Sequence, residues 1–210
     1  MKTSQKGFTL IEIAIVLVII GLLLGGVMKG QELITQSKIR SVEKEFDGVT
    51  VAVLGYRERY KALPGDDLQA KARWTSSDDG NGDGEIGGNF NSSTATDESR
   101  LLWQHLRAAG LVTGHTVPTQ QPANAAGGII GVQTDISDGA AKILEGTLVC
   151  TTNLPAAVAN AIDAAQDEGL PEQGSVRGFK QSASNTPDYA EQITAYVDDG
   201  KTLYTLCKQI

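Results

Sequence analysis

The sequence predicts an α+β protein, in which a long N-terminal α-helix packs on a C-terminal antiparallel β-sheet. No proline interrupts residues 8–63, so a single helix can extend from about Phe8 to Lys61. The first half of this helix is apolar enough to lie in a membrane, whereas its second half is amphipathic. Beyond residue 128, short apolar stretches separated by turn-forming residues are typical of strands.

The apolar segment from Phe8 to Met28 contains a single charged residue, Glu12. About 20 apolar residues suffice to span a bilayer, and Lys2 and Lys6 favour a cytoplasmic N-terminus. A carboxylate at the centre of a membrane helix costs about 2.5–3.5 kcal/mol, and a plain membrane anchor leaves that cost unexplained. A secretory signal peptide fits less well, because the apolar run is too long and no small-residue cleavage pattern follows it.

The second half of the helix carries an apolar stripe whose members share one helix face, because they recur at alternating spacings of three and four residues. These are Ile39, Val42, Phe46, Val49, Val53, Tyr56 and Tyr60. Such a stripe suits a coiled coil or a helix that covers a sheet of its own chain. Three heptads are marginal for a coiled coil, so we expect packing within the chain.

The remaining elements follow from local patterns. They are an irregular stretch anchored by Trp74, a helix at 94–109, strands at 129–134 and 143–150, a helix at 155–166, a third strand at 174–179, and a hairpin of 193–197 with 202–207. Thr94 is the expected cap of the first of these helices. The hairpin has the clearest turn composition, Asp-Asp-Gly-Lys, between its two apolar runs.

The N-terminal sequence Lys6-Gly7-Phe8-Thr9-Leu10-Ile11-Glu12 resembles the processing motif of type IV prepilins and type II secretion pseudopilins. The resemblance implies that a prepilin peptidase cuts after Gly7 and that the new N-terminal residue, Phe8, is methylated. It also implies that Glu12 pairs with the terminal amine of a neighbouring subunit during assembly. Opposite charges that pair in a low dielectric offset part of each other's desolvation cost. Such pairing would explain why a charged residue occurs in an otherwise apolar segment.

The resemblance further implies the pilin fold and a division of the chain into three parts. These are a leader peptide at residues 1–7, the membrane-spanning and filament-core half of the helix at 8–30, and a globular domain at 31–210 that includes the amphipathic half of the helix. The protein would begin as a single-pass inner-membrane protein with a cytoplasmic N-terminus. It would then move into a cell-surface pilus or a periplasmic filament.

The function that this resemblance implies is that of a structural subunit of a type IV pilus or pilus-like helical filament. The alternative is a pseudopilin of a type II secretion system. The expected partners are copies of the chain and related pilins or pseudopilins, prepilin peptidase, the membrane and an inner-membrane assembly platform. A third possibility, a membrane-anchored calcium-dependent binding module that never polymerises, is disfavoured by Glu12.

Composition and motifs disfavour two other classes of function. The chain has 18 Lys and Arg against 25 Asp and Glu, a net charge of −7, so general nucleic-acid binding is not expected. His105 and His115 lack the spacing of a metal-dependent hydrolase, and no nucleophile, phosphate-binding or dinucleotide motif occurs. We therefore expect no enzymatic activity, and a structural or surface role for His105.

The stretch DGNGDGEI, at residues 79–86, has the D-x-N-x-D-G spacing of calcium-binding loops. The candidate ligands are the side chains of Asp79, Asn81 and Asp83 and the backbone carbonyl of Glu85. The twelfth position is Phe90 in place of the usual Glu, so Glu98 or Asp97 would have to complete a structural Ca²⁺ site. The alternative is a solvated loop without a metal.

Cys150 and Cys207 are the only cysteines. Outside the cytoplasm they would form a disulfide, which contributes about 2–4 kcal/mol of stability; inside it they would be two buried thiols. The expected location favours the disulfide. Asp163, Asp167 and Glu168 form a second acidic group, for which a solvated face is favoured over a second metal site.

Overall fold

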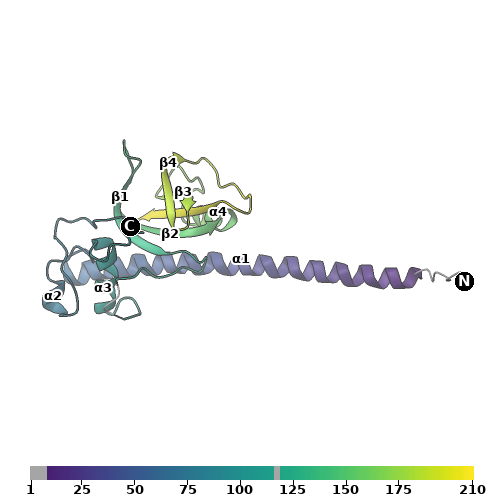
Figure 1. The fold of residues 1–210 in the computed structure, drawn as a ribbon, viewed down its shortest axis with the longest axis horizontal. Coiled ribbons are helices and arrows are strands. Elements are labelled where there is room, and N and C mark those ends of the chain that lie inside the picture. The colour runs from purple at the N-terminus through teal and green to yellow at the C-terminus, as the bar shows by residue number, and fades with distance from the viewer. Residues whose placement is uncertain (1–8, 116–118) are drawn as a thin grey trace, which may run out of the picture. The chain divides into compact units, whose positions relative to one another are not determined.

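The computed structural model describes residues 9–115 and 119–210. Its elements are α1 (Leu10–Tyr60), α2 (Ala70–Arg73), α3 (Glu98–Ala108), β1 (Ile130–Ser137), β2 (Lys142–Pro155), α4 (Ala156–Gln166), β3 (Val176–Ala183), β4 (Thr186–Gln192) and β5 (Leu203–Gln209) (Figure 1). The chain divides into two compact units, Met1–Ser37 and Lys38–Ile210. The predicted α+β class, with a long N-terminal helix and a C-terminal antiparallel sheet, is confirmed.

In the first unit, α1 is helical from Leu10 onward and continues through the glycines of the apolar segment. The large apolar side chains of this segment are exposed rather than packed against other parts of the chain. Among the described residues, α1 is the one helix whose length and composition would allow it to cross a membrane. Exposure of so much apolar surface to water is unfavourable.

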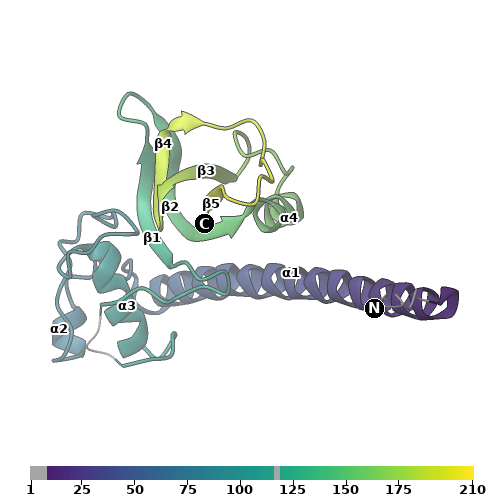
Figure 2. The same cartoon turned by 45° about the vertical axis from the view of Figure 1, so that its right-hand side comes forward.

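The second unit contains a five-stranded antiparallel sheet in the order β1-β2-β5-β3-β4. The last strand in sequence therefore lies at the centre of the sheet, between β2 and β3. The sheet is curled (Figure 2). The β3–β4 turn contacts β2, since the backbone N–H of Asn185 donates to Asn153 (3.1 Å) and the hydroxyl of Thr152 donates to the Asn185 side chain (2.6 Å).

Two apolar cores result from this curl. The larger one joins one face of the sheet to the second half of α1, to α3 and to α4. The predicted stripe on α1 lies in it: Val42, Phe46, Val49, Val53 and Tyr56 are buried, and Ile39 and Tyr60 are partly buried. The expected packing within the chain is thus confirmed. The smaller core includes Phe90, Leu148 and Phe179.

The predicted disulfide is present in the smaller core. Cys150 and Cys207 are directly paired residues on β2 and β5, and their Cα atoms are 4.0 Å apart. Both cysteines are fully buried. The bond therefore links two neighbouring strands at the centre of the sheet, instead of closing a surface loop.

The predicted hairpin of residues 193–197 with 202–207 is wrong. The second segment forms β5, but the first is irregular, and the strand before it is β4. Side chains replace the backbone ladder here, because the Tyr204 hydroxyl bonds both the N–H and the carbonyl of Val197 (2.8 and 3.2 Å). Ile193 packs into the larger core. Within 193–197 Ile193 is buried and Tyr196 is partly buried, whereas Ala195 and Val197 are exposed, so the apolar alternation does not correspond to a strand.

Two further expectations need correction. The helix predicted from Thr94 begins at Glu98, because residues 94–97 form a turn in which the Asp97 N–H donates to the Thr94 carbonyl (3.1 Å). Trp74 is only partly buried, whereas Ile86 and Phe90 are the buried anchors of the irregular stretch. The helix at 155–166 is confirmed as α4, with Pro155 at its N-cap.

Candidate functional site

The start of α1 is organised by two side chains, Thr9 and Glu12. The Glu12 carboxylate accepts hydrogen bonds from the backbone N–H and from the hydroxyl of Thr9, both at 2.8 Å. In return, the Glu12 N–H donates to the Thr9 hydroxyl oxygen at 3.3 Å. This reciprocal arrangement is a capping box, which satisfies N–H groups that have no partner within the helix.

Glu12 therefore already has a role in a single chain, because it caps the helix in which it lies. A carboxylate at this end also interacts favourably with the helix dipole. The Thr-x-x-Glu spacing was a sufficient signal for the cap, and the sequence interpretation missed it because it considered the acid as a charge in the membrane and as a docking group for a neighbouring amine. The predicted processing residues, Gly7 and Phe8, lie outside the described residues.

Comparison with protein families agrees with the predicted motif. The family model of the prokaryotic N-terminal methylation motif matches residues 2–28. The chain carries the N-terminal signature of type IV pilins and pseudopilins. No curated protein and no solved structure matches the chain. The match ends within α1, so the globular domain of this pilin-like chain must be interpreted from its own residues.

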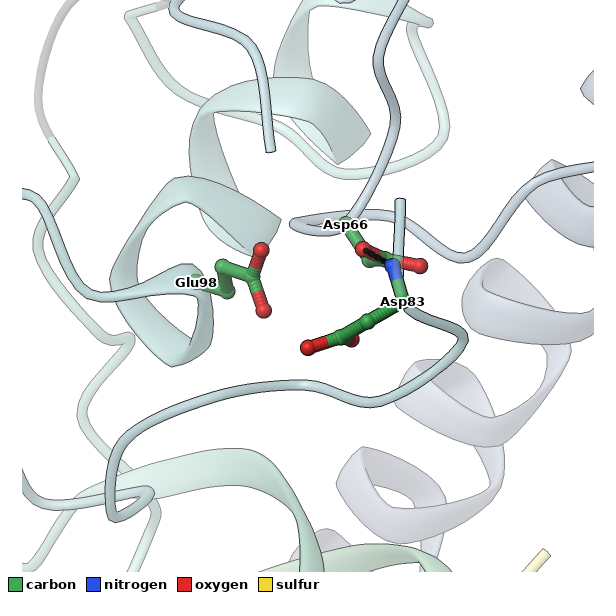
Figure 3. A group of neighbouring side chains, drawn as sticks. All are labelled: Asp66, Asp83 and Glu98. Carbon is green, nitrogen blue, oxygen red and sulfur yellow. Dashed lines mark hydrogen bonds between the residues drawn. The ribbon is translucent and has the colours of Figure 1, made fainter. Parts of the chain in front are cut away.

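A second candidate site is the acidic group of Asp66, Asp83 and Glu98 (Figure 3). Carboxylate oxygens from the three side chains lie within 4.8 Å of one another. Asp66 lies in the turn after α1, Asp83 comes from the loop before α3, and Glu98 is the first residue of α3. Asp66 and Glu98 are buried, whereas Asp83 is exposed. Two predicted ligands are thus brought together, with Asp66 as an unforeseen third member.

The buried carboxylates hold the loop at residues 79–87 in place. Asp66 accepts hydrogen bonds from the N–H groups of Gly82, Asp83 and Gly84, at 2.5, 3.0 and 2.9 Å. Glu98 accepts two more, from the N–H groups of Asn81 and Gly87, both at 2.8 Å. Hydrogen bonds to a charged acceptor are stronger than neutral ones, so the loop is shaped by side chains outside it.

The other predicted ligands form hydrogen bonds elsewhere in the chain. Asp79 accepts from the N–H of Lys71, and Asn81 accepts from that of Asp83, both at 2.8 Å. Asp97, the alternative to Glu98, accepts from the Ser92 hydroxyl at 2.5 Å. Glu85 donates its own N–H to Asp83 at 2.9 Å, and its side chain is exposed. The carboxylates of Asp79, Glu85 and Asp97 do not belong to the close acidic group found among the described residues.

Calcium at this group stays a prediction. Carboxylate oxygens are the ligands that Ca²⁺ prefers, and three carboxylates this close repel one another unless a cation or hydrogen-bond donors offset the repulsion. The five N–H groups already supply part of that compensation. The acidic group can therefore hold the loop alone or hold it together with an ion.

His105 fixes two segments that precede this loop in the chain, at Gly65 and at Asp78. The Gly65 N–H donates to Nδ1 at 2.9 Å, so Nε2 carries the proton and donates to the Asp78 carbonyl at 2.7 Å. The ring also stacks on Tyr56, with centroids 6.1 Å apart. Burial lowers the pKa of His105, which keeps it neutral. His105 is thus a buried structural residue.

The second acidic group is not a solvated face, because Asp163 is fully buried in α4. Its carboxylate accepts a hydrogen bond from the Tyr196 hydroxyl at 2.5 Å. Burial raises the pKa of Asp163. A hydrogen bond with Glu168, together with the N–H groups of Ser175 and Val176, lowers the pKa of Asp167 to about 2. The group therefore fastens α4 to the segments around it.

Proposed function

We propose that this pilin-like chain is a structural subunit of a type IV pilus or pilus-like helical filament. Prepilin peptidase would process it after Gly7 and the product would be methylated on Phe8. The methylation motif at residues 2–28 carries the proposal. It is supported by α1, whose apolar side chains lie exposed on a single subunit and would be covered by lipid before assembly and by other subunits after it.

Processing is tested by mass spectrometry of the N-terminus of the protein purified from cells with an active prepilin peptidase. We expect the chain to begin at a methylated Phe8. A chain that still begins at Met1 would refute processing. A Gly7→Ala variant is the matched control, since it should keep the leader and remain in the membrane.

The role of the Glu12 charge is tested by two substitutions that separate docking from capping. Glu12→Gln removes the charge, but a Gln at this position can still take part in a capping box. Glu12→Ala removes both the charge and the hydrogen bonds that the carboxylate accepts in the capping box. If the charge docks a neighbouring amine, both variants should insert, be cleaved and fail to form filaments. Normal filament yield from Glu12→Gln would reject docking and leave capping as the function of the residue.

The alternative, a pseudopilin of a type II secretion system, predicts a short periplasmic filament in place of a surface fibre. Electron microscopy of fibres sheared from wild-type and gene-deleted cells separates the two. Surface fibres that disappear on deletion would support the pilus. Loss of protein secretion without loss of surface fibres would support the pseudopilin. A structural role without catalytic activity belongs to either form of the proposal.

A further inference from the structure

Asn81, in the loop at residues 79–87, is the one asparagine of the chain that precedes a glycine. In such a pair the backbone nitrogen of the glycine can attack the side-chain carbonyl carbon of the asparagine, because glycine has no Cβ to obstruct the approach. Asn81 and Gly82 are both exposed. Asn81 also lines an open cleft of about 430 Å³, so water can reach its side chain and ammonia can leave.

The backbone nitrogen of Gly82 lies against a carboxylate. Its N–H donates to Oδ1 of Asp66 at 2.5 Å, the shortest of the five hydrogen bonds that Asp66 and Glu98 accept from the loop. An amide nitrogen is a poor nucleophile while it keeps its proton. A carboxylate within hydrogen-bond distance of that proton is placed to accept it as a general base. Asp66 therefore contacts the proton that the attack must remove.

The carbonyl group of the Asn81 side chain is held in place as well. Its Oδ1 accepts the N–H of Asp83 at 2.8 Å. This donor points at the oxygen on which negative charge develops when the carbon is attacked, and such donors stabilise that charge. The backbone N–H of Asn81 donates to Glu98 at 2.8 Å, which fixes the residue within the loop. A fixed arrangement of the reacting groups lowers the entropic cost that a free peptide would meet.

We propose that Asn81 is a site of deamidation within the chain, with Asp66 as the general base. The nitrogen of Gly82 forms a bond to Cγ of Asn81 and passes its proton to Asp66. The carbon–nitrogen bond of the side-chain amide then breaks, and ammonia leaves with the proton that Asp66 received. Water opens the resulting cyclic succinimide at either carbonyl. The product has aspartate or isoaspartate in place of Asn81.

Either product changes the acidic group of Asp66, Asp83 and Glu98. Aspartate adds a negative charge where carboxylates already repel one another. Isoaspartate adds a methylene to the backbone of the loop, so the N–H groups before and after it cannot all keep their bonds to Asp66 and Glu98. The modification should therefore weaken the loop. The inference concerns a single chain and does not depend on the proposed filament.

The direct test compares the full chain in detergent micelles with a synthetic peptide of residues 76–88, in the same neutral buffer containing a chelator. Mass spectrometry detects the exchange of an amide for a carboxyl group, and isoaspartyl methyltransferase labels the isoaspartate. We expect deamidation of Asn81 to be about tenfold faster in the folded chain than in the peptide. An equal or slower rate in the folded chain would overturn the inference, because the fold would then protect the pair.

Variants of the full chain test the role of each group. Asp66→Asn removes the base, so the rate should fall to that of the peptide whether or not the loop stays folded. Asn81→Gln should give no product at this position, because the longer side chain would have to close a larger ring. Asp78→Asn is the matched control, since it makes the same change on an exposed acid whose side chain forms none of the hydrogen bonds described for Asn81 and Gly82. Equal rates in Asp66→Asn and Asp78→Asn would overturn the inference.

Discussion

In both the start of α1 and the acidic loop, a carboxylate accepts hydrogen bonds from backbone N–H groups. The two regions differ in how far apart the partners lie along the chain. At the helix start, Glu12 accepts hydrogen bonds from Thr9, three residues away, and both are exposed. In the loop, Asp66 accepts from three N–H groups that are 16 to 18 residues away, and it is buried. The first arrangement is local and provides hydrogen-bond partners at the end of a helix. The second joins distant segments and belongs to the tertiary structure.

Among single substitutions, we expect the largest loss of stability at the buried Asp66. Asp66→Ala leaves three backbone N–H groups without their charged acceptor, so we expect a loss of about 3 kcal/mol or more in the free energy of unfolding. Asp79→Ala is the control, because it removes one bond to an exposed acceptor and should cost about 1 kcal/mol. Denaturant unfolding measures both; similar costs would contradict the central place given to Asp66.

Calcium would sharpen the comparison, because the sequence and the structure imply different ligand sets. If the close acidic group binds the ion, calcium at a hundredfold excess over its Kd should stabilise the protein by about 2.7 kcal/mol. Asp83→Asn should abolish the rise in melting temperature, whereas Asp79→Asn should preserve it. Loss of the shift in both variants would favour the loop ligands expected from spacing. No shift in the unmutated protein would reject the site.

Asp163 is another buried carboxylate, and its contribution to stability should depend on pH. Burial raises its pKa in the folded state, so its contribution to stability is fully present below the ordinary Asp value of about 4 and is lost as pH rises through the raised value. Asp163→Asn should remove this decline and keep an acceptor for Tyr196. Unfolding measured between about pH 4 and 8 tests the sign. An unchanged decline in the variant would assign it to other groups.

Tyr196→Phe tests the hydrogen bond that Asp163 accepts. It removes the donor at 2.5 Å and leaves a buried acceptor oxygen without it, which we expect to cost about 1–3 kcal/mol. The cost should be larger at neutral than at acidic pH, because the Tyr196 hydrogen bond favours the charged form of Asp163 and so lowers its pKa. A free energy of unfolding equal to that of the unmutated protein would show that the bond contributes nothing.

Local patterns in the sequence predicted most of the secondary structure, because their signals lie within one element. The stripe from Ile39 to Tyr60 and the helix after Pro155 are of this kind, whereas the disulfide was predicted from the presence of only two cysteines and their expected location. Asp66 was missed because its donors become neighbours only when the loop folds back onto the turn after α1. The irregular segment at 193–197 was misassigned for a related reason. Its partners are the side chains of Tyr204 and the larger core, which an alternating apolar pattern does not reveal.

The smallest effect is expected at the helix start, where the cap acts on a few residues only. Thr9→Val removes the hydroxyl that bonds Glu12 and should cost about 1 kcal/mol, whereas Thr9→Ser retains it. Because the cap is exposed and local, amide hydrogen exchange at the start of α1 should rise about fivefold in Thr9→Val, while unfolding of the globular domain stays unchanged. Equal exchange in the two variants would mean that the capping box does not hold the helix start. If Thr9→Val also blocked filament formation as completely as Glu12→Gln, the geometry of the cap and the charge of Glu12 would be inseparable parts of one docking group.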